Sequence, residues 1–198
     1  YDGSRDGSFE IIRRMREGDK RIRAIQFRRN YGKSAALAVA FEAVRGEVVV
    51  TMDSDLQDDP GEVPAMIDQL EEGYDLVSGW KQRRQDPITK TLPSKLFNWV
   101  TGRVSGLRLH DFNCGLKVYR REVVETIPVY GDLHRYLPVL AHWSGFRVTE
   151  RPVQHHPRKY GTSKFGIGRF THGLFDLLTV YFVSNYTRRP LHLFGSFG

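Results

Sequence analysis

Two carboxylates and an amide follow a run of apolar, β-branched residues, and they are the side chains best suited to chemistry. If the chain stays extended after Met52, then Asp53, Asp55 and Gln57 point the same way, because alternate residues of a strand share a face. Their oxygen atoms are the ligands that Mg²⁺ or Mn²⁺ prefers when the ion also holds a phosphorylated substrate. The spacing therefore predicts a divalent-metal site.

The alternative for this acidic stretch is that it caps the next helix. Asp59, Pro60 and Glu62 form a helix start, with a capping carboxylate, a proline at the first position and an acid in the first turn. We assign Asp58 to the same capping role. Capping gives the two earlier aspartates no task, which favours metal binding for that pair.

The elements that position these residues alternate between predicted strands and helices. Strands are expected at residues 22–27, 47–52, 75–79, 111–119 and 146–154, and helices at 9–17, 35–45, 62–72, 93–105, 120–127 and 132–143. The alternation indicates an α/β fold with a mostly parallel sheet and helices on both faces. Such folds bind ligands at the carboxyl ends of their strands, where the acidic stretch lies.

The composition limits the classes of protein that fit. A chain of 198 residues with a 40% hydrophobic share suits one domain, or one domain with an appendage. Its single cysteine, Cys114, excludes an internal disulfide. No apolar run reaches the ~18 residues that a membrane-spanning helix needs.

The two parts of the chain differ in charge. Residues 1–80 hold 11 Lys/Arg against 16 Asp/Glu, whereas residues 81–198 hold 19 against 7. The acidic part suits a cation, and the basic part suits phosphates, nucleic acid or an anionic membrane. Residues 166–186 place apolar side chains at helical spacing, which fits a helix packed on the core or one lying at a membrane surface.

Taken in order, these pieces resemble the family 2 glycosyltransferases of the GT-A fold, in the branch that transfers sugars to polyprenyl phosphates. Five stretches carry the resemblance, in the order of the family: Asp2 to Ser8, Asn30 to Lys33, Met52 to Pro60, Asp111 to Lys117 and Arg158 to Lys164.

On the donor side, the resemblance implies that Asp53 and Asp55 are the DxD motif. A Mg²⁺ or Mn²⁺ ion on this motif bridges the diphosphate of a nucleotide sugar, with Gln57 as a further ligand. The resemblance also implies that Asp2 contacts the nucleotide and that Lys33 lies near the nucleotide or its phosphates.

On the acceptor side, the resemblance assigns Lys81, Lys90, Ser94 and Lys164 to the acceptor phosphate. Lys81 and Lys90 stand where the family usually has arginine, which replaces a two-pronged guanidinium by a point charge. Arg158 matches an arginine that bridges the donor and acceptor phosphates. The predicted catalytic residues are Asp55, Asp111 and Arg158.

The nature of the acceptor decides the role of Asp111. A sugar hydroxyl needs a general base, and Asp111 is the candidate. A lipid phosphate is already an anion at neutral pH and needs only cations to hold it. The favoured prediction is therefore inverting transfer of a hexose from a UDP- or GDP-sugar to undecaprenyl or dolichyl phosphate. A family 2 enzyme acting on a sugar hydroxyl is the first alternative, and a nucleic-acid-binding module is a remote one.

Two departures from the family lead to expectations about the whole protein. The first strand of the fold is missing ahead of Tyr1, which stands where an aspartate is usual, so we expect an N-terminal truncation. We also expect residues 1–164 to be the catalytic domain and residues 165–198 an amphipathic, membrane-proximal segment, with transmembrane helices beyond it. The expected location is the cytoplasmic face of a membrane. We expect no nucleic-acid partner, and a homo-oligomer is compatible with the sequence.

Overall fold

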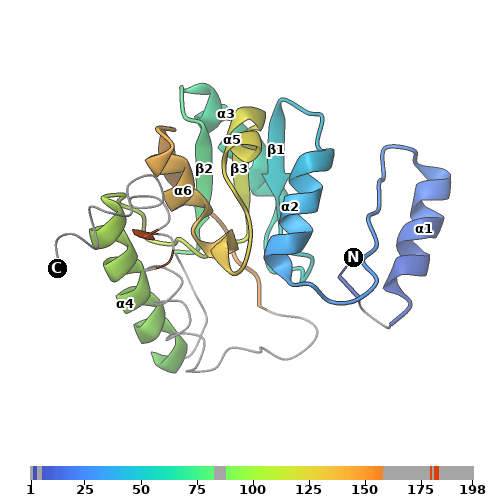
Figure 1. The fold of residues 1–198 in the computed structure, drawn as a ribbon, viewed down its shortest axis with the longest axis horizontal. Coiled ribbons are helices and arrows are strands. Elements are labelled where there is room, and N and C mark those ends of the chain that lie inside the picture. Colours follow the sequence, from blue (N-terminus) through green and yellow to red (C-terminus); the bar gives the residue numbers. More distant parts are fainter. Residues whose placement is uncertain (1, 4–5, 83–87, 158–178, 180, 183–198) are drawn as a thin grey trace, which may run out of the picture. The chain divides into compact units, whose positions relative to one another are not determined.

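The computed structural model describes residues 2–3, 6–82, 88–157, 179 and 181–182, without the side chains of residues 88–93. The chain divides into two compact units, and each is described by itself. One comprises residues 1–44 and 128–134, and the other comprises residues 45–127 and 135–198. Figure 1 shows the fold with its elements labelled.

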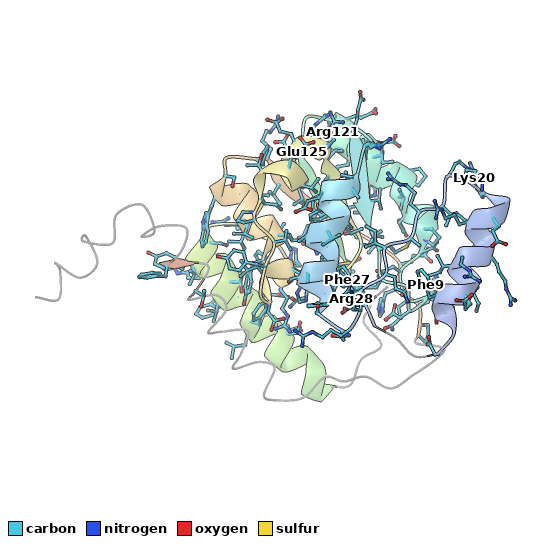
Figure 2. All side chains as sticks on the ribbon, turned by 45° about the vertical axis from the view of Figure 1, so that its right-hand side comes forward. Phe9, Lys20, Phe27, Arg28, Arg121 and Glu125 are labelled. Carbon is cyan, nitrogen blue, oxygen red and sulfur yellow. The ribbon has the colours of Figure 1, made fainter. Side chains whose placement is uncertain are left out.

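The first unit contains two helices, α1 (Ser8–Gly18) and α2 (Lys33–Ala43). Helix α1 has no buried residue. Figure 2 shows it with Phe9 labelled near its start and Lys20 just after its end. Both helices were expected. The strand expected at residues 22–27 is wrong, because the segment is irregular and pairs with no neighbouring strand among the described residues. Alternating apolar residues make a strand only where a second backbone completes the hydrogen bonds.

The second unit is built on a four-stranded sheet. Its strands are β1 (Val48–Thr51), β2 (Leu76–Trp80), β3 (Lys117–Arg120) and β4 (Val148–Pro152), in the order β1-β3-β2-β4. Strand β3 pairs antiparallel with both β1 and β2, and only β2 and β4 pair in parallel. The expectation of a mostly parallel sheet is therefore wrong for the described strands. Sequence periodicity located all four strands, but it carries no information on the direction in which β3 enters between its neighbours.

The remaining elements of this unit are helices. They are the 3₁₀ turn η1 (Pro60–Glu62), α3 (Val63–Glu71), α4 (Ile88–Ser105), α5 (Arg121–Thr126), the 3₁₀ turn η2 (Leu133–Arg135) at the boundary between the units, and α6 (Leu137–Trp143). The single helix expected at residues 132–143 is thus divided into η2 and α6. No helix within the described part of the chain has the length and apolar character to cross a bilayer.

Helices cover both faces of the sheet. On one face, Met66 and Leu70 of α3 lie one turn apart and pack against Val77 and Val118. On the other face, the cross-strand partners of β2 and β3 are also fully buried, with Tyr119 opposite Leu76. Helix α6 contacts β2 and β4, and α5 contacts β1 and β3 (Figure 1). Burial on both faces fixes the two central strands, β2 and β3, and with them the ends at which the loops begin.

Candidate active site

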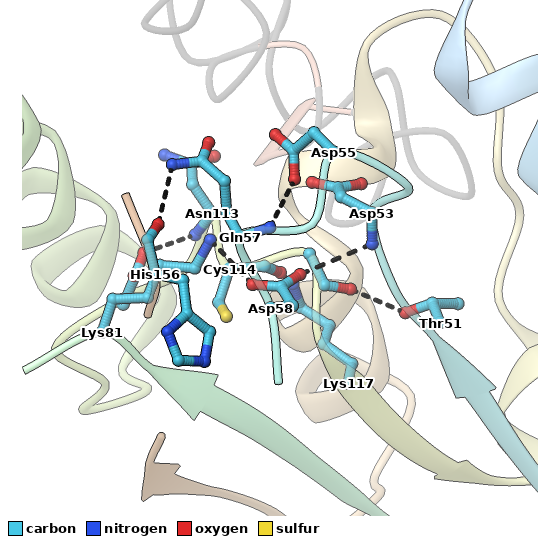
Figure 3. Close-up of polar contacts among 12 residues, drawn as sticks. Thr51, Asp53, Asp55, Gln57, Asp58, Lys81, Asn113, Cys114, Lys117 and His156 are labelled. Atoms are coloured by element: carbon cyan, nitrogen blue, oxygen red, sulfur yellow. Dashed lines mark hydrogen bonds and ion pairs between the residues drawn. The ribbon is translucent and has the colours of Figure 1, made fainter. Parts of the chain in front are cut away.

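The loop after β1 carries the predicted metal ligands, but it is not extended. Residues 54–56 form a turn, and Leu56 has a positive φ of 60°. The expectation that alternation along a strand aligns the three side chains is therefore wrong. Asp53 and Asp55 both lie on this loop, directly after β1 (Figure 3). The Asp55 Oδ1 atom accepts the main-chain N–H of Gln57 at 3.3 Å, which stabilises the turn.

Gly115, in the segment before β3, packs closely against Asp53 and fixes its position. The Thr51 hydroxyl donates to the carbonyl oxygen of Gly115 at 3.0 Å, so the end of β1 is fastened to the residues before β3. A Cβ atom at Gly115 would lie 2.6 Å from Cγ of Asp53, well inside van der Waals contact. Only glycine leaves room for the Asp53 carboxylate in this position.

The third predicted ligand, Gln57, is tied to a more distant segment. Its amide Nε2 donates to the carbonyl oxygen of His156 at 3.2 Å, and the N–H of His156 donates back to the Gln57 carbonyl at 2.8 Å. An isolated antiparallel bridge joins Asp58 and His155 beside this pair. The acidic loop is thus paired with the segment that leads toward Arg158 and Lys164, which both lie outside the described residues.

Asp58 and Asp59 have different roles, although both were assigned to capping. Asp59 does cap the turn η1, accepting the N–H of Gly61 at 2.8 Å. The Asp58 assignment is wrong: its side chain is 0% exposed, and Oδ1 lies 3.0 Å from Nζ of Lys81. The Oδ2 atom of Asp58 accepts the N–H of Asp53 at 3.4 Å. Capping needs only one acid before Pro60, and the surplus acid was the signal in the sequence that could have indicated another role.

The electrostatic surroundings keep Lys81 charged. Its side chain is 15% exposed, and this burial disfavours the ammonium, but the negative charges of Cys114, once that thiol ionises at high pH, and of Asp58 and Asp111 outweigh that effect. The pKa of Lys81 is therefore raised above its ordinary value. Burial also raises the pKa of the Cys114 thiol to about 11, only partly offset by Lys117 and Lys81. At neutral pH Lys81 is thus protonated, and Cys114 is a neutral thiol rather than a nucleophile.

Lys81 opens onto a pocket of about 600 Å³ between the end of β2, α4 and the segment before β3. Ser94 and Asp111 line the same pocket, so the structure brings together three of the predicted acceptor-side residues. Asp111 is 1% exposed, and its Oδ1 accepts the N–H of Asn113 at 3.1 Å. The side chain of Lys90 is not among those described.

The sequence did not reveal a second cluster that lines this pocket. The ring of His110 stacks on Trp80, with their centroids 4.0 Å apart and the rings inclined by 14°. Glu150 accepts the His110 N–H at 2.7 Å and also contacts the imidazole Nδ1, while Asn98 donates to the His110 carbonyl at 2.6 Å. These contacts fix the position of His110, which lines the pocket.

In the first unit, Asp2 organises the start of α2. Its two carboxylate oxygens accept the N–H groups of Tyr31 at 2.6 Å and Gly32 at 2.8 Å, and its carbonyl accepts the Asn30 amide at 3.1 Å. Lys33 is the first residue of α2. The two stretches expected to contact the nucleotide therefore lie against each other within this unit.

The donor atoms at the acidic loop suit a divalent ion that is held largely by its substrate. Within the described ranges, no group of three or more His, Cys, Asp and Glu side chains could by itself hold a metal. The loop offers the carboxylates of Asp53 and Asp55 and the amide oxygen of Gln57, all hard oxygen donors. Mg²⁺ is commonly bound by one or two carboxylates together with substrate phosphates, so these residues fit such an ion.

The mixed sheet, with a carboxylate loop at the end of β1, is a GT-A-like glycosyltransferase fold. A solved structure of glucosyl-3-phosphoglycerate synthase from Mycobacterium tuberculosis, in complex with phosphoglyceric acid, aligns with a TM-score of 0.63 and 17% identity, covering 92% of this chain and 66% of that one. Another structure of that enzyme, with Mn²⁺, UDP-glucose and glycerol 3-phosphate, aligns with a TM-score of 0.60 and 18% identity, covering 90% and 66%.

Sequence comparison identifies the family. The model of glycosyl transferase family 2 matches residues 1–127, and the chain belongs to this family. A dodecaprenyl-phosphate galacturonate synthase of Rhizobium johnstonii is 38% identical over the whole chain and 60% of its own length. An undecaprenyl-phosphate 4-deoxy-4-formamido-L-arabinose transferase of Salmonella paratyphi B is 35% identical over the whole chain and 59% of its own length. The chain thus spans about 60% of the length of these curated relatives.

Proposed function

We propose that this chain is the catalytic part of a membrane-associated transferase that moves a hexose from a UDP- or GDP-sugar to a polyprenyl phosphate. Two relatives support the acceptor, because both are named for polyprenyl-phosphate products or substrates and both match along the whole chain. The cytoplasmic face of the membrane is part of the proposal, since nucleotide sugars are made in the cytosol.

The observation that carries the proposal is the charged lysine at the pocket. A phosphate monoester, with a second pKa near ~6, is already a nucleophilic anion at neutral pH. It needs a cation to hold it rather than a base to deprotonate it. Lys81 supplies this cation at a pocket that also contains Ser94, whose hydroxyl can donate to a phosphate oxygen. The raised pKa of Lys81 keeps the ammonium charged wherever the acceptor is an anion.

On the donor side, Asp53, Asp55 and the amide oxygen of Gln57 would hold Mg²⁺ or Mn²⁺ against the diphosphate. When bound, the ion neutralises the negative charge that develops on the leaving nucleotide. Close packing against Gly115 fixes the position of the Asp53 carboxylate. Asp2 and Lys33 would contact the nucleotide, and Arg158 and Lys164 would contact the phosphates.

The transfer is a single displacement. An oxygen of the acceptor phosphate forms a bond to the anomeric carbon while the bond from that carbon to the diphosphate breaks, and the electron pair leaves with the nucleotide. Attack from the face opposite the leaving group inverts the anomeric configuration. Lys81 orients the acceptor, and Asp111 orients the acceptor or a basic neighbour rather than accepting a proton.

The test is transfer by the full-length protein in detergent, with Mg²⁺ or Mn²⁺, undecaprenyl or dolichyl phosphate, and a panel of radiolabelled nucleotide sugars. Metal-dependent label in the organic phase is the expected result, and it also identifies the donor. Nucleotide-sugar binding without any lipid product would contradict the proposed acceptor.

Asp111 distinguishes this proposal from transfer to a sugar hydroxyl, which its position at the pocket would also allow. Asp111→Asn keeps the size of the side chain and an oxygen that can accept the main-chain N–H of Asn113. We expect only a several-fold loss in the rate of transfer to lipid phosphate, whereas removal of a general base lowers the rate by roughly 10²–10⁴-fold. Steady-state kinetics of the variant decides between the two, and a loss in the larger range would favour the hydroxyl acceptor.

A further inference from the structure

Asp58 occupies a position that the proposed reaction does not yet use. It lies between the acidic loop and the pocket, and its side chain is completely buried. One carboxylate oxygen faces the Lys81 ammonium at 3.0 Å, and the other accepts the Asp53 N–H at 3.4 Å. Figure 3 shows Asp58 between these two residues.

The ion pair decides where the lysine points. A lysine side chain has four rotatable carbon–carbon bonds, and its ammonium is a compact point charge without the fixed geometry of a guanidinium. Such a group binds a ligand well only if something else fixes its position. The Asp58 Oδ1 atom lies against the Lys81 ammonium as an ion pair, in surroundings from which solvent is excluded on the Asp58 side.

The backbone fixes the carboxylate in turn. Asp58 forms an isolated bridge with His155, and its neighbour Gln57 is bound at both main chain and side chain to His156. A buried charge that is anchored in this way cannot follow the lysine into solvent. It therefore holds the ammonium at the pocket, even though the lysine stem could extend elsewhere.

We propose that Asp58 is a positioning residue for Lys81, holding the ammonium at the pocket where it receives the phosphate of the acceptor. This inference rests on the proposed function and adds a residue that acts on the acceptor only through another side chain. It also explains how a lysine can serve in place of the more rigid arginine: the buried carboxylate supplies the geometry that the side chain lacks.

The test measures binding of farnesyl phosphate, a soluble polyprenyl monophosphate, to the full-length protein in detergent by isothermal titration calorimetry. We expect Asp58→Asn and Lys81→Met each to weaken binding by ~10-fold, the size typical for a residue that orients a binding group. The double variant is expected to bind no more weakly than Lys81→Met alone, because Asp58 acts through the lysine. A purely structural effect of Asp58 would add to the lysine effect instead.

Asp59→Asn is the matched control. It removes a carboxylate at the next residue, which caps η1 and contacts the His156 imidazole but lies outside the pocket lining, and wild-type affinity is expected. Should Asp58→Asn fold poorly, the double variant removes both charges of the buried pair and restores a neutral site for comparison with Lys81→Met.

The outcomes separate the inference from the function on which it rests. Wild-type affinity in Asp58→Asn, or losses that multiply in the double variant, would overturn the positioning role alone. Failure of farnesyl phosphate to bind the wild-type protein would overturn the acceptor assignment and this inference together.

Discussion

Asp55→Asn is expected to abolish most of the sugar transfer while the protein stays folded. The substitution keeps the size of the side chain and an oxygen that can accept the Gln57 N–H, so the turn after β1 can persist. It removes one of the two negative charges that the proposed ion requires. Because charge stabilisation of the leaving group is lost, we expect kcat to fall by on the order of 10²–10³-fold. The measurement is transfer of labelled sugar into lipid at saturating donor and acceptor.

A second readout shows whether the loss comes from the metal. Electron paramagnetic resonance of Mn²⁺ in the presence of the nucleotide reports binding directly, and Asp55→Asn is expected to weaken it. Asp59→Asn changes a nearby carboxylate that caps η1 and contacts the imidazole of His156, and an asparagine oxygen can keep both contacts, so it should bind Mn²⁺ and turn over as the wild type does. Full activity in Asp55→Asn would rule out metal binding at this loop.

The local patterns of the sequence predicted most helices and strands. Such elements follow the periodicity of apolar residues, and capping and helix-breaking residues mark their ends. Glycine and proline marked the ends correctly at α3, where Pro60 opens the preceding turn and Gly73 follows the last helical residues. The direction of β3 and the absence of a strand at residues 22–27 depend on which backbone lies alongside, and no local pattern encodes that neighbour.

The site shows the same division between local and distant information. The types of residue after β1 indicated a hard-cation site, and that inference needed no knowledge of geometry. The expected alignment by strand alternation was wrong, because a turn with Leu56 at positive φ interrupts the extended chain between Asp53 and Gln57. The contact of Asp58 with Lys81 joins residues that are 23 positions apart, and nothing near either residue predicts it.

Gly115→Ala is expected to reduce transfer by ~10²-fold, although it changes a residue that contacts no substrate in the proposed reaction. The new methyl group would lie 2.6 Å from Cγ of Asp53, so the carboxylate must move. A shift of about 1 Å in a group that positions reacting atoms can cost 10²-fold in rate. Gly18→Ala is the control for loss of glycine, because a Cβ there would meet nothing within 4 Å.

Combining Gly115→Ala with Asp53→Asn tests whether the methyl group acts through the carboxylate. If displacement of the Asp53 carboxylate is the whole effect, the double variant transfers sugar as slowly as Asp53→Asn alone. Asp53→Asn has already removed the negative charge, so moving the side chain has no further effect. Losses that multiply would instead mean that alanine disturbs the approach of β3 to β1, where the Thr51 hydroxyl is bound to the Gly115 carbonyl. Thermal unfolding separates these cases, since only the second predicts a lower melting temperature for Gly115→Ala.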